Sequence, residues 1–552
     1  MEAVAPIAGQ ALQDALCQLM ESELIYGRGA PPKATYIFKH ALVQDTAYVS
    51  LLRGRRQRFH ADIAQALKQR TGDEECPPAI IAHHFTEAGL AEQAAPYWLA
   101  AAELALSQSA PAEAEGHASA GIALIPRVTE SPERDALELG LLVARANAMV
   151  PLKSISAPET FEALAAAKRL LDRGVGTDLQ RVSILYGLCS ASTLSSRLKQ
   201  ALDFAHQIIE VAERLDDPTY RVVGYRQLGT LQFYAGQNRE ALQSLQKGYT
   251  YRDPRRQRAL SYRFGWDQGV AILSFEVLVR LSLGLLDSAA QVSEQVRIEL
   301  LSHGHATTVA SATFCTRTWP ELVLEDLEGL ERDSAELAAY CAEKRVEQIR
   351  LLASLHQAYA RAAREPVERN IATFRATLGA LRRSGGNAGS SITICNLAEA
   401  LLAAGDLEGA ETALQDAFAF VEQSGEHYWL AGLHRLSGHV ALKRRQPDRF
   451  RAEACFRKAI EIARGQEARL LELRTAIDLA RLWRDTGSDN DPRALLEPIL
   501  AAIEGGETTH DVRNARALLA ELRVNDFNHP RGKIALAHSR ASAGSTKDSR
   551  LN

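Results

Sequence analysis

The sequence predicts an all-α protein: a superhelix of paired helices with a small cap at its N-terminal end. Three observations predict it. Of the 552 residues, 46% are hydrophobic but only 6% are aromatic, and such a composition favours helix over sheet. The helix breakers Gly and Pro are few, at 36 and 19 residues. Helices rich in small residues recur after short turns along most of the chain, as in helical-repeat proteins.

Charge and cysteine spacing exclude several classes of protein. The 64 Lys and Arg residues nearly balance the 68 Asp and Glu residues, which argues against a nucleic-acid coat protein or a polybasic membrane binder. The seven cysteines form no CxxC pair, so we expect buried, unreactive thiols in a reducing cytoplasm and no metal site. No apolar run reaches 18 residues, and the first residues lack a basic leader, so neither a membrane span nor a signal peptide is predicted.

Residues 1–75 form the predicted cap. We expect a helix over about 8–22, a short strand at 35–38 (TYIF), and two further helices that meet near Gly54. This order is typical of a small winged-helix module. The open end of a repeat array needs a cover, and we expect these apolar residues to supply it: Ala41, Leu42, Ala47, Tyr48, Leu51 and Leu52.

Residues 76–524 form the predicted repeat array. Four helices carry a central alanine after a short turn, and each follows a longer apolar helix such as RVVGYRQLGTLQFYAG (221–236) or ITICNLAEALLAAG (392–405). Small side chains let paired helices pack closely. We expect roughly ten helix pairs over 90–524, and the aligned contact alanines are Ala201, Ala241, Ala410 and Ala454. Residues 525–552 lack apolar periodicity and are predicted to be a disordered tail.

Several stretches resemble one family of bacterial fusion proteins. YIFKHALVQDTAYVSLLRGRRQRFHADIAQAL (36–67) and AHHFTEAGLAEQAAPYWLAAAELALSQSAPAEA (82–114) resemble the junction that follows a STAND/AAA ATPase module. LHRLSGHVAL (433–442), ELRTAIDLARLWRDTG (472–487) and THDVRNARALLAEL (509–522) resemble the last repeats of the same proteins. That family fuses a class III adenylate/guanylate cyclase, the ATPase and a long array. The resemblance implies a winged-helix-like cap and tetratricopeptide-like repeats, with the ATPase and cyclase parts absent from this chain.

No motif points to catalysis. The stretch Gly385-Gly386-Asn387-Ala388-Gly389-Ser390 lacks the lysine of a phosphate-binding loop, and we interpret it as an inter-helix loop in which Ser390 or Ser391 caps the next helix. His83 and His84 point about 100° apart on a helix, which favours packing over metal binding. No G-x-S-x-G elbow marks a nucleophile. The sequence therefore predicts no catalytic, cofactor-binding or metal-binding residue and no cofactor.

Two basic clusters have a functional and a structural interpretation. Arg53, Arg55, Arg56 and Arg58 lie in the winged-helix-like segment, where they either contact phosphates or form a solvated helix start. A second cluster, in a loop between repeats, either binds an acidic partner or is simply exposed: Tyr251, Arg252, Arg255, Arg256, Arg258, Tyr262 and Arg263.

The preferred function is a non-enzymatic signalling or scaffold module. Stacked helix pairs leave a concave groove that binds a protein or peptide, and an ATPase or cyclase chain in trans is one such partner by resemblance. The alternatives are a piece of a cyclase–ATPase signalling enzyme and a winged-helix transcriptional regulator; nucleic acid and membrane are not the expected partners. The predicted groove residues lie on the first helices of their pairs: Tyr225, Gln227, Gln232, Trp266, Gln268, Asn396 and His434.

Overall fold

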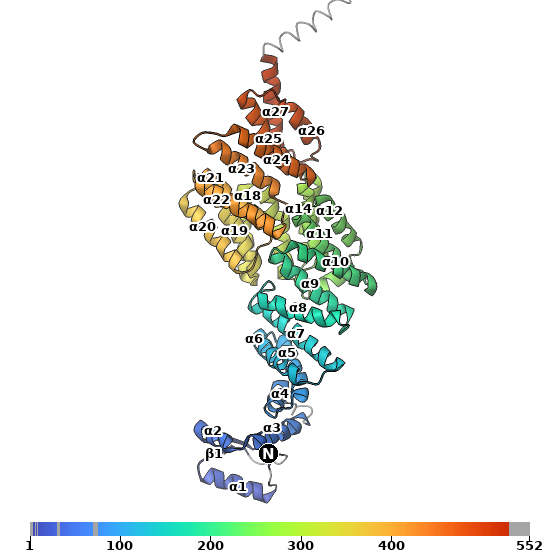
Figure 1. The fold of residues 1–552 in the computed structure, drawn as a ribbon, viewed down its shortest axis with the longest axis vertical. Coiled ribbons are helices and arrows are strands. Elements are labelled where there is room, and N and C mark those ends of the chain that lie inside the picture. The colour runs from blue at the N-terminus through green and yellow to red at the C-terminus, as the bar shows by residue number, and fades with distance from the viewer. Residues whose placement is uncertain (1–3, 6, 8, 30–33, 70–75, 529–552) are drawn as a thin grey trace, which may run out of the picture. The chain divides into compact units, whose positions relative to one another are not determined.

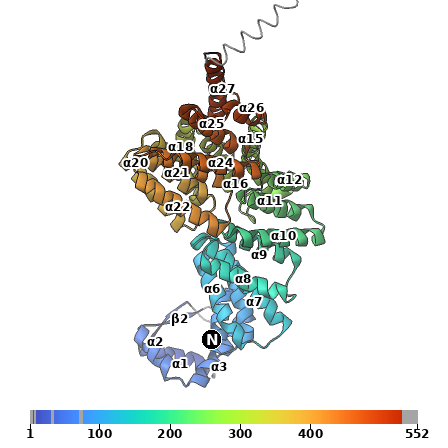
Figure 2. The same cartoon turned by 45° about the horizontal axis from the view of Figure 1, so that its top comes forward.

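The computed structural model describes residues 4–5, 7, 9–29, 34–69 and 76–528 (Figure 1). The protein is all-α, as predicted, and the one pair of strands in this part of the chain is a short hairpin. The chain divides into two compact units, 1–184 and 185–552. This division falls inside the predicted array of 76–524, while the predicted tail lies, apart from 525–528, outside the described residues. Figure 2 gives a second view of the same elements.

The N-terminal unit combines a β-hairpin with helices that pack in sequence order. The strands pair antiparallel, with Ile25 opposite Phe38. Its elements are α1 (Gln10–Glu21), β1 (Ile25–Arg28), β2 (Thr35–Phe38), α2 (Ala41–Ser50), α3 (Arg53–Lys68), α4 (Pro78–Glu87), α5 (Ala91–Ser107), α6 (Pro111–Leu124), the 3₁₀ turn η2 (Ile125–Arg127), α7 (Pro132–Leu152) and α8 (Pro158–Asp172). α9 (Asp178–Leu194) crosses the division between the units.

The cover of the array differs from the sequence prediction. Helix α2 has no buried residue, and Leu42 and Leu52 are 79% and 80% exposed. Of the six residues expected to form the cover, only Leu51 is even half-buried. Helix α3 packs on α4 instead, where Ala64 joins a core with Ile81 and Phe85. The prediction failed because apolar spacing on one helix does not reveal which of two adjacent helices finds a partner.

The C-terminal unit is a superhelix of tetratricopeptide-like helix pairs. In both views α10–α12 lie on one side of this unit and α20–α22 on the other (Figures 1 and 2). Its elements are α10 (Leu198–Leu215), α11 (Pro218–Tyr234), α12 (Asn238–Thr250), α13 (Pro254–Ala259), α14 (Gln268–Ser282), α15 (Leu286–Leu300), α16 (Ala306–Thr313), the π-helical turn η3 (Phe314–Thr318), α17 (Trp319–Val323), α18 (Leu327–Lys344), α19 (Glu347–Arg364), α20 (Glu368–Arg383), α21 (Ser390–Ala403), α22 (Leu407–Ser424), α23 (Leu430–Lys443), α24 (Arg449–Gly465), α25 (Arg469–Thr486), α26 (Pro492–Ala501) and α27 (His510–Asn528).

Aspartates start many of these helices. An N-cap carboxylate accepts hydrogen bonds from backbone N–H groups that the first helical turn leaves unpaired. Each such aspartate directly precedes its helix, so its position in the sequence fixes where the helix begins. The capping residues are Asp217, Asp253, Asp267, Asp326, Asp406, Asp448 and Asp491.

Close helix packing follows the small residues, with one correction. Ala201, Ala241 and Ala410 are fully buried, as the alignment of repeats predicts. Ala454 is exposed, and Ala452, two residues earlier, is buried in its place. The register shifts because α24 meets α23 at Gly438, where a Cβ atom would lie 2.5 Å from the ring of Phe456. The face that α24 buries is therefore set by Phe456 together with Ala452.

The superhelix closes on itself. Asn238 at the start of α12 donates a 2.8 Å hydrogen bond to the backbone oxygen of Gln466, which lies 228 residues further along the chain. Beside it, Arg239 forms an ion pair with Glu467. At the start of α15, the backbone N–H of Leu286 donates to the oxygen of Glu504, and Asp287 accepts from the N–H of Gly506. These contacts join α12 and α15 to the segments that follow α24 and α26, far along the chain.

Candidate functional site

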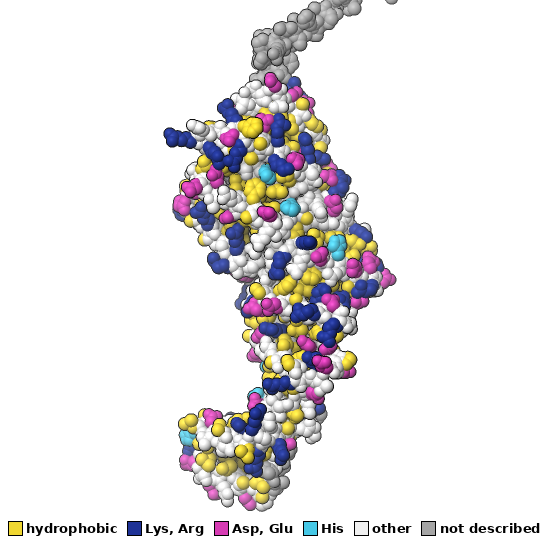
Figure 3. Space-filling view, viewed as in Figure 1, with side chains coloured by type: hydrophobic (Ala, Val, Ile, Leu, Met, Phe, Trp, Pro, Cys, Tyr) yellow, Lys and Arg dark blue, Asp and Glu magenta, His cyan; other side chains and the backbone are white. Residues whose placement is uncertain are grey.

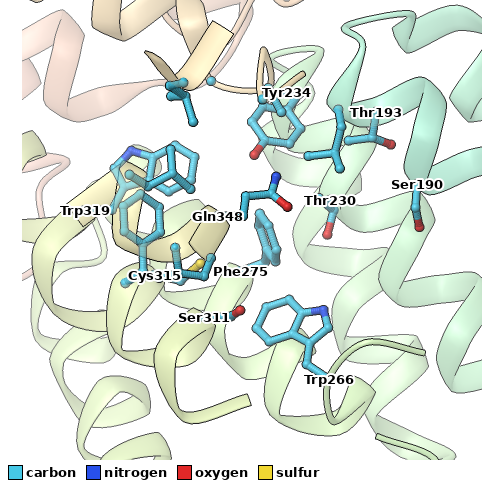
Figure 4. Close-up of a pocket in the computed structure, with 18 of the residues that line it drawn as sticks. Ser190, Thr193, Thr230, Tyr234, Trp266, Phe275, Ser311, Cys315, Trp319 and Gln348 are labelled. Carbon is cyan, nitrogen blue, oxygen red and sulfur yellow. The ribbon is translucent and has the colours of Figure 1, made fainter. Parts of the chain in front are cut away.

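The interior of the C-terminal unit holds a cavity of about 250 Å³. Its walls come from α9, α11, α14, α16, η3, α17, α19 and the loop between α20 and α21. Figure 4 shows Gln348 projecting into this space between Trp319 and Thr230, with Trp266 at one end. Six aromatic side chains from four parts of the chain line it: Tyr186, Tyr234, Trp266, Phe275, Phe314 and Trp319.

Helix α11 supplies the most polar wall of the cavity. Nearly every residue of α11 is buried, so both faces of this helix are covered. Arg226, Thr230 and Tyr234 are spaced four residues apart and therefore share one stripe of the helix. All three line the cavity, and Gln227 lines it beside Arg226. The opposite face packs on α12, where a Cβ atom on Gly229 would lie 2.6 Å from Leu245.

Aromatic contacts join distant helices beside the cavity. The Tyr234 ring lies 6.3 Å from that of Trp319 and 5.8 Å from that of Tyr428, which belongs to the α22–α23 loop. The backbone N–H of Tyr428 also donates to the oxygen of Tyr234. Trp319 in turn contacts Phe314 of the π-helical turn at 5.6 Å. Tyr234, Phe314 and Trp319 line the cavity themselves, whereas Tyr428 packs against Tyr234 and Trp319 outside the lining.

Arg226 is a buried cation held by neutral groups. Its guanidinium donates from Nε to Oε1 of Gln268 at 2.8 Å and from Nη2 to the hydroxyl of Tyr186 at 3.2 Å. It also lies over the rings of Tyr186 and Trp266, 5.8 Å from each centroid. Among the described residues no carboxylate lies within ion-pair distance of it, although only 5% of the residue is exposed.

Two further polar groups in the cavity wall lack partners among the described residues. Oγ1 of Thr230 and Nδ1 of His356 are inaccessible and make no hydrogen bond. The His356 ring lies 4.8 Å from the Phe314 ring, and burial lowers the pKa of His356 to about 3. His356 is therefore neutral at physiological pH. Buried polar groups normally find a partner, so these two unpartnered atoms beside the cavity are unusual.

Two backbone N–H groups at the glycine-rich loop of the cavity wall donate hydrogen bonds to a carboxylate of the same chain. Glu426 accepts hydrogen bonds from the backbone N–H groups of Gly389 and Ser391, each at 2.9 Å, and from the Ser391 hydroxyl. Burial raises the pKa of Glu426 to about 7. The expected capping of α21 by Ser390 or Ser391 is wrong: Gly389 is the N-cap residue, and Glu426 satisfies the amides.

The predicted groove residues separate into two groups. Gln227 and Trp266 line the cavity, and Gln268 accepts a hydrogen bond from Arg226. The others lie elsewhere: Tyr225 stacks on Tyr251, Gln232 is half-buried outside the lining, Asn396 borders a much smaller pocket, and His434 contacts Phe418. Sequence reasoning missed the aromatic residues from α9, η3 and α17. The signal that could have found them is the polar stripe of α11, which is unusual for a helix buried on both faces.

The basic clusters are less coherent than their sequence suggests. At about 100° per residue, Arg53 and Arg56 lie on one side of α3 and Arg55 and Arg58 on roughly the opposite side, so the four do not form one patch. Arg56 lies over the ring of Tyr48. In the second cluster Arg252 forms an ion pair with Glu299, while Tyr262 is 81% exposed.

For the histidines and cysteines of the described residues, the sequence predicts no metal site and buried thiols. His60 and His84 approach Nδ1 to Nδ1 at 2.8 Å, and His83 lies beside them, yet no group of metal-ligating side chains is found among the described residues. Four thiols are buried, but Cys17 is exposed, contrary to the expectation of buried thiols. No described helix has the length and apolar character that crossing a membrane requires.

Comparison with known proteins gives one sequence relative. No protein-family model matches the chain. An uncharacterized protein of Rhizobium meliloti (strain 1021) is 27% identical over 495 residues, which cover 87% of this chain and 47% of the relative. The chain thus spans about half the length of the curated relative it matches.

Solved structures with similar helix arrangements share little sequence with the chain. The Rap protein complexed with competence and sporulation factor has a TM-score of 0.46 at 12% identity, covering 67% of this chain and 98% of that one. The apo form of the quorum sensor NprR from B. thuringiensis has a TM-score of 0.33 at 13% identity, covering 75% of this chain and 99% of that one. A STAND protein with a tetratricopeptide repeat sensor from Pyrococcus horikoshii has a TM-score of 0.35 at 14% identity, covering 75% of this chain and 59% of that one.

Proposed function

We propose that this chain is a non-enzymatic sensor module of a signalling protein. Its C-terminal unit would bind a ligand in the internal cavity and so change how the chain engages a protein partner. The observation that carries the proposal is the aromatic cavity enclosed by a superhelix that closes on itself, with polar groups in its wall that have no partner among the described residues. Ligand pockets combine mainly apolar walls with a few polar groups in this way.

The partner surface is proposed on the N-terminal unit. Leu42 and Val49 of α2 are 79% and 69% exposed, and Leu52, just after this helix, is 80% exposed. Figure 3 shows hydrophobic side chains gathered over the part of this unit that holds α1 and α2. Exposed apolar side chains gathered on one surface are typical of a protein contact. An ATPase or cyclase chain in trans is the partner that the family resemblance implies.

The experiment measures ligand binding and catalysis on one preparation of the full chain. A panel of small apolar and aromatic compounds is screened by thermal shift, and ATP hydrolysis and cyclic-nucleotide formation are assayed in parallel. We expect compounds that raise the melting temperature of the wild type but not of Ser311→Trp, which fills the cavity. Thr412→Trp, on the outer face of α22, is the matched control. Turnover of ATP or GTP, or shifts that survive the filled cavity, would contradict the proposal.

A second candidate is the sensor part of a larger cyclase–ATPase signalling enzyme. The relative from Rhizobium meliloti is longer than this chain, which spans 47% of it, and the cyclase and ATPase parts are what the family resemblance implies. An in-frame phosphate-binding loop and cyclase sequence in the genomic DNA before Met1 would support this candidate over a separate chain.

A further inference from the structure

We infer that the cavity of the C-terminal unit binds a small aromatic or apolar carboxylate, whose anion is held by Arg226. The inference rests on the proposed sensor function and names the chemical class of its ligand. It starts from a comparison of two arginines. Arg226 and Arg474 are both 5% exposed. Arg474 is neutralised by Asp511 and Glu325, whereas Arg226 has no carboxylate partner among the described residues.

The neighbours of Arg226 orient its guanidinium without neutralising it. Gln268 and Tyr186 take Nε and Nη2, and the two aromatic rings cover its faces. Nη1 has no hydrogen-bond partner among the described residues. An unpaired buried charge is strongly unfavourable, while the fork of a guanidinium matches a carboxylate. The rings of Tyr186 and Trp266 stabilise part of the positive charge of Arg226 through cation–π contacts. An anion from outside the chain would neutralise this charge.

The acidic groups near the cavity are already engaged. Glu276 of α14 is buried but forms its ion pair with Arg280. Glu426 accepts from Gly389 and Ser391 on the opposite wall. Tyr234 stays neutral, because burial holds the pKa of its phenol well above the ordinary value. No group of this wall thus supplies the missing negative charge.

A second, independent observation places ligand-binding groups in the same space. Thr230 is one helical turn from Arg226, and its hydroxyl is unpartnered, as is Nδ1 of the neutral His356. Both residues are more than nine-tenths buried and line the cavity. Both atoms are covered in the structure, so they would reach the polar part of a ligand only after a side-chain rotation, while its apolar part would lie among Phe275, Phe314 and Trp319.

Volume and charge narrow the ligand class. The cavity of about 250 Å³ lies just below the range of about 300–1,000 Å³ that is typical of small-molecule pockets, so it fits a small organic acid better than a peptide segment. A carboxylate carries one negative charge, which one guanidinium matches. A phosphate dianion would leave a second charge unpaired in an apolar site.

The test compares 2-naphthoate with its neutral amide, 2-naphthamide, by isothermal titration calorimetry on the full chain. We expect 2-naphthoate to bind at least tenfold tighter than the amide. In Arg226→Met this preference should vanish, while in Arg255→Met, which removes an exposed arginine of α13, it should persist. Because Arg226→Met removes an unpaired buried charge, its melting temperature should equal or exceed that of the wild type. That readout also shows whether the variant is folded.

Each other outcome overturns a defined part of the account. Equal binding of both probes to the wild type, or an undiminished preference in Arg226→Met, would overturn the carboxylate inference and leave the cavity as a ligand site. Should Arg226→Met melt well below the wild type, the argument from an unpaired charge is wrong, and the ratio of the two probes on the wild type alone decides. If neither probe binds, the inference fails; if the thermal-shift panel also gives no hit, the sensor function fails with it.

Discussion

At the scale of residues, the interior of the C-terminal unit is organised by buried charges. Arg474 of α25 donates to both carboxylate oxygens of Asp511, at 3.0 and 2.6 Å, and to the backbone oxygen of Val323 at 2.8 Å. Nη1 lies 3.0 Å from Glu325. One side chain thus joins α25 to α27 and to the turn after α17, which precedes it by about 150 residues.

Replacing Arg474 should destabilise the protein strongly. Arg474→Met leaves Asp511, which is 2% exposed, without a partner, and breaking a buried pair in this way costs about 3–5 kcal/mol. Urea denaturation measures the loss. The matched control is Arg297→Met, which removes an exposed ion pair with Glu294 and should cost less than about 1 kcal/mol. Equal losses of unfolding free energy in the two variants would show that the buried ion pair of Arg474 contributes no more to stability than an exposed one.

His356 should make the protein acid-sensitive. Its pKa of about 3 in the fold lies below the ordinary value of 6.5, so the unfolded chain binds the proton first. The stabilisation is present above pH 6.5 and is lost progressively as the pH falls from 6.5 toward 3. Between pH 7.5 and pH 5 the wild type should lose about 2 kcal/mol through this group, a loss that His356→Phe avoids.

Urea midpoints at the two pH values check the contribution of His356. His206→Gln serves as the control, because this histidine is exposed on α10 and its replacement should leave the acid sensitivity unchanged. If His356→Phe loses as much stability as the wild type on acidification, His356 is not the group responsible.

At the scale of elements, two features position the cavity. The π-helical turn η3 interrupts the helical run from α16 to α17 and turns Phe314 and Cys315 toward the cavity. Such turns are frequent at functional sites. The second feature is the set of contacts that close the superhelix, among them the hydrogen bond of 3.0 Å from the Gly506 N–H to Asp287.

Weakening one closing contact should loosen the ring locally. Asp287→Ala removes the acceptor of the Gly506 N–H, at a cost of about 1 kcal/mol. Hydrogen exchange should accelerate over 503–509 and at the start of α15. Asp203→Ala, at an exposed position of α10, is the matched control and should leave exchange at 503–509 unchanged. Unaltered exchange in Asp287→Ala would mean that this contact does not hold the ring closed.

The sequence predicted helices better than it predicted what they contact. The strand at 35–38 and the first helix are confirmed, because alternation and helix breakers are local signals. The faces of the helices are not local properties. Ala452 replaced Ala454 because Phe456 selects the contact with α23, and α2 remained exposed although its spacing resembles that of a buried helix.

The cavity itself was only partly predictable. Gln227 and Trp266 were among the expected groove residues and line the cavity. Gln227 lies on α11 as expected, whereas Trp266 lies in the segment just before α14 and not on a helix. Trp319 and His356 reach the same space because α14 packs against η3 and α17, and α19 packs against η3. A further contact, that of Asn238 with Gln466, joins residues 228 apart. No periodicity in the sequence reports contacts at that separation.

At the scale of the whole molecule, we propose a different role for each of the two compact units. The C-terminal unit encloses the cavity, and its two halves meet around the ligand-sized space. The N-terminal unit carries the exposed apolar helix proposed for partner contact. We therefore expect the superhelix of the C-terminal unit to be a ligand-binding unit whose occupant joins the helices around the cavity.

Hydrogen exchange of the full chain with and without 2-naphthoate tests this claim most directly. We expect slower exchange in α11, α14 and η3, which line the cavity, and also at Asn238 and 466–467, where α12 meets the end of α24. The same addition to Arg226→Met should change exchange at these sites much less. Unchanged exchange throughout the C-terminal unit, or protection confined to other helices, would contradict the account.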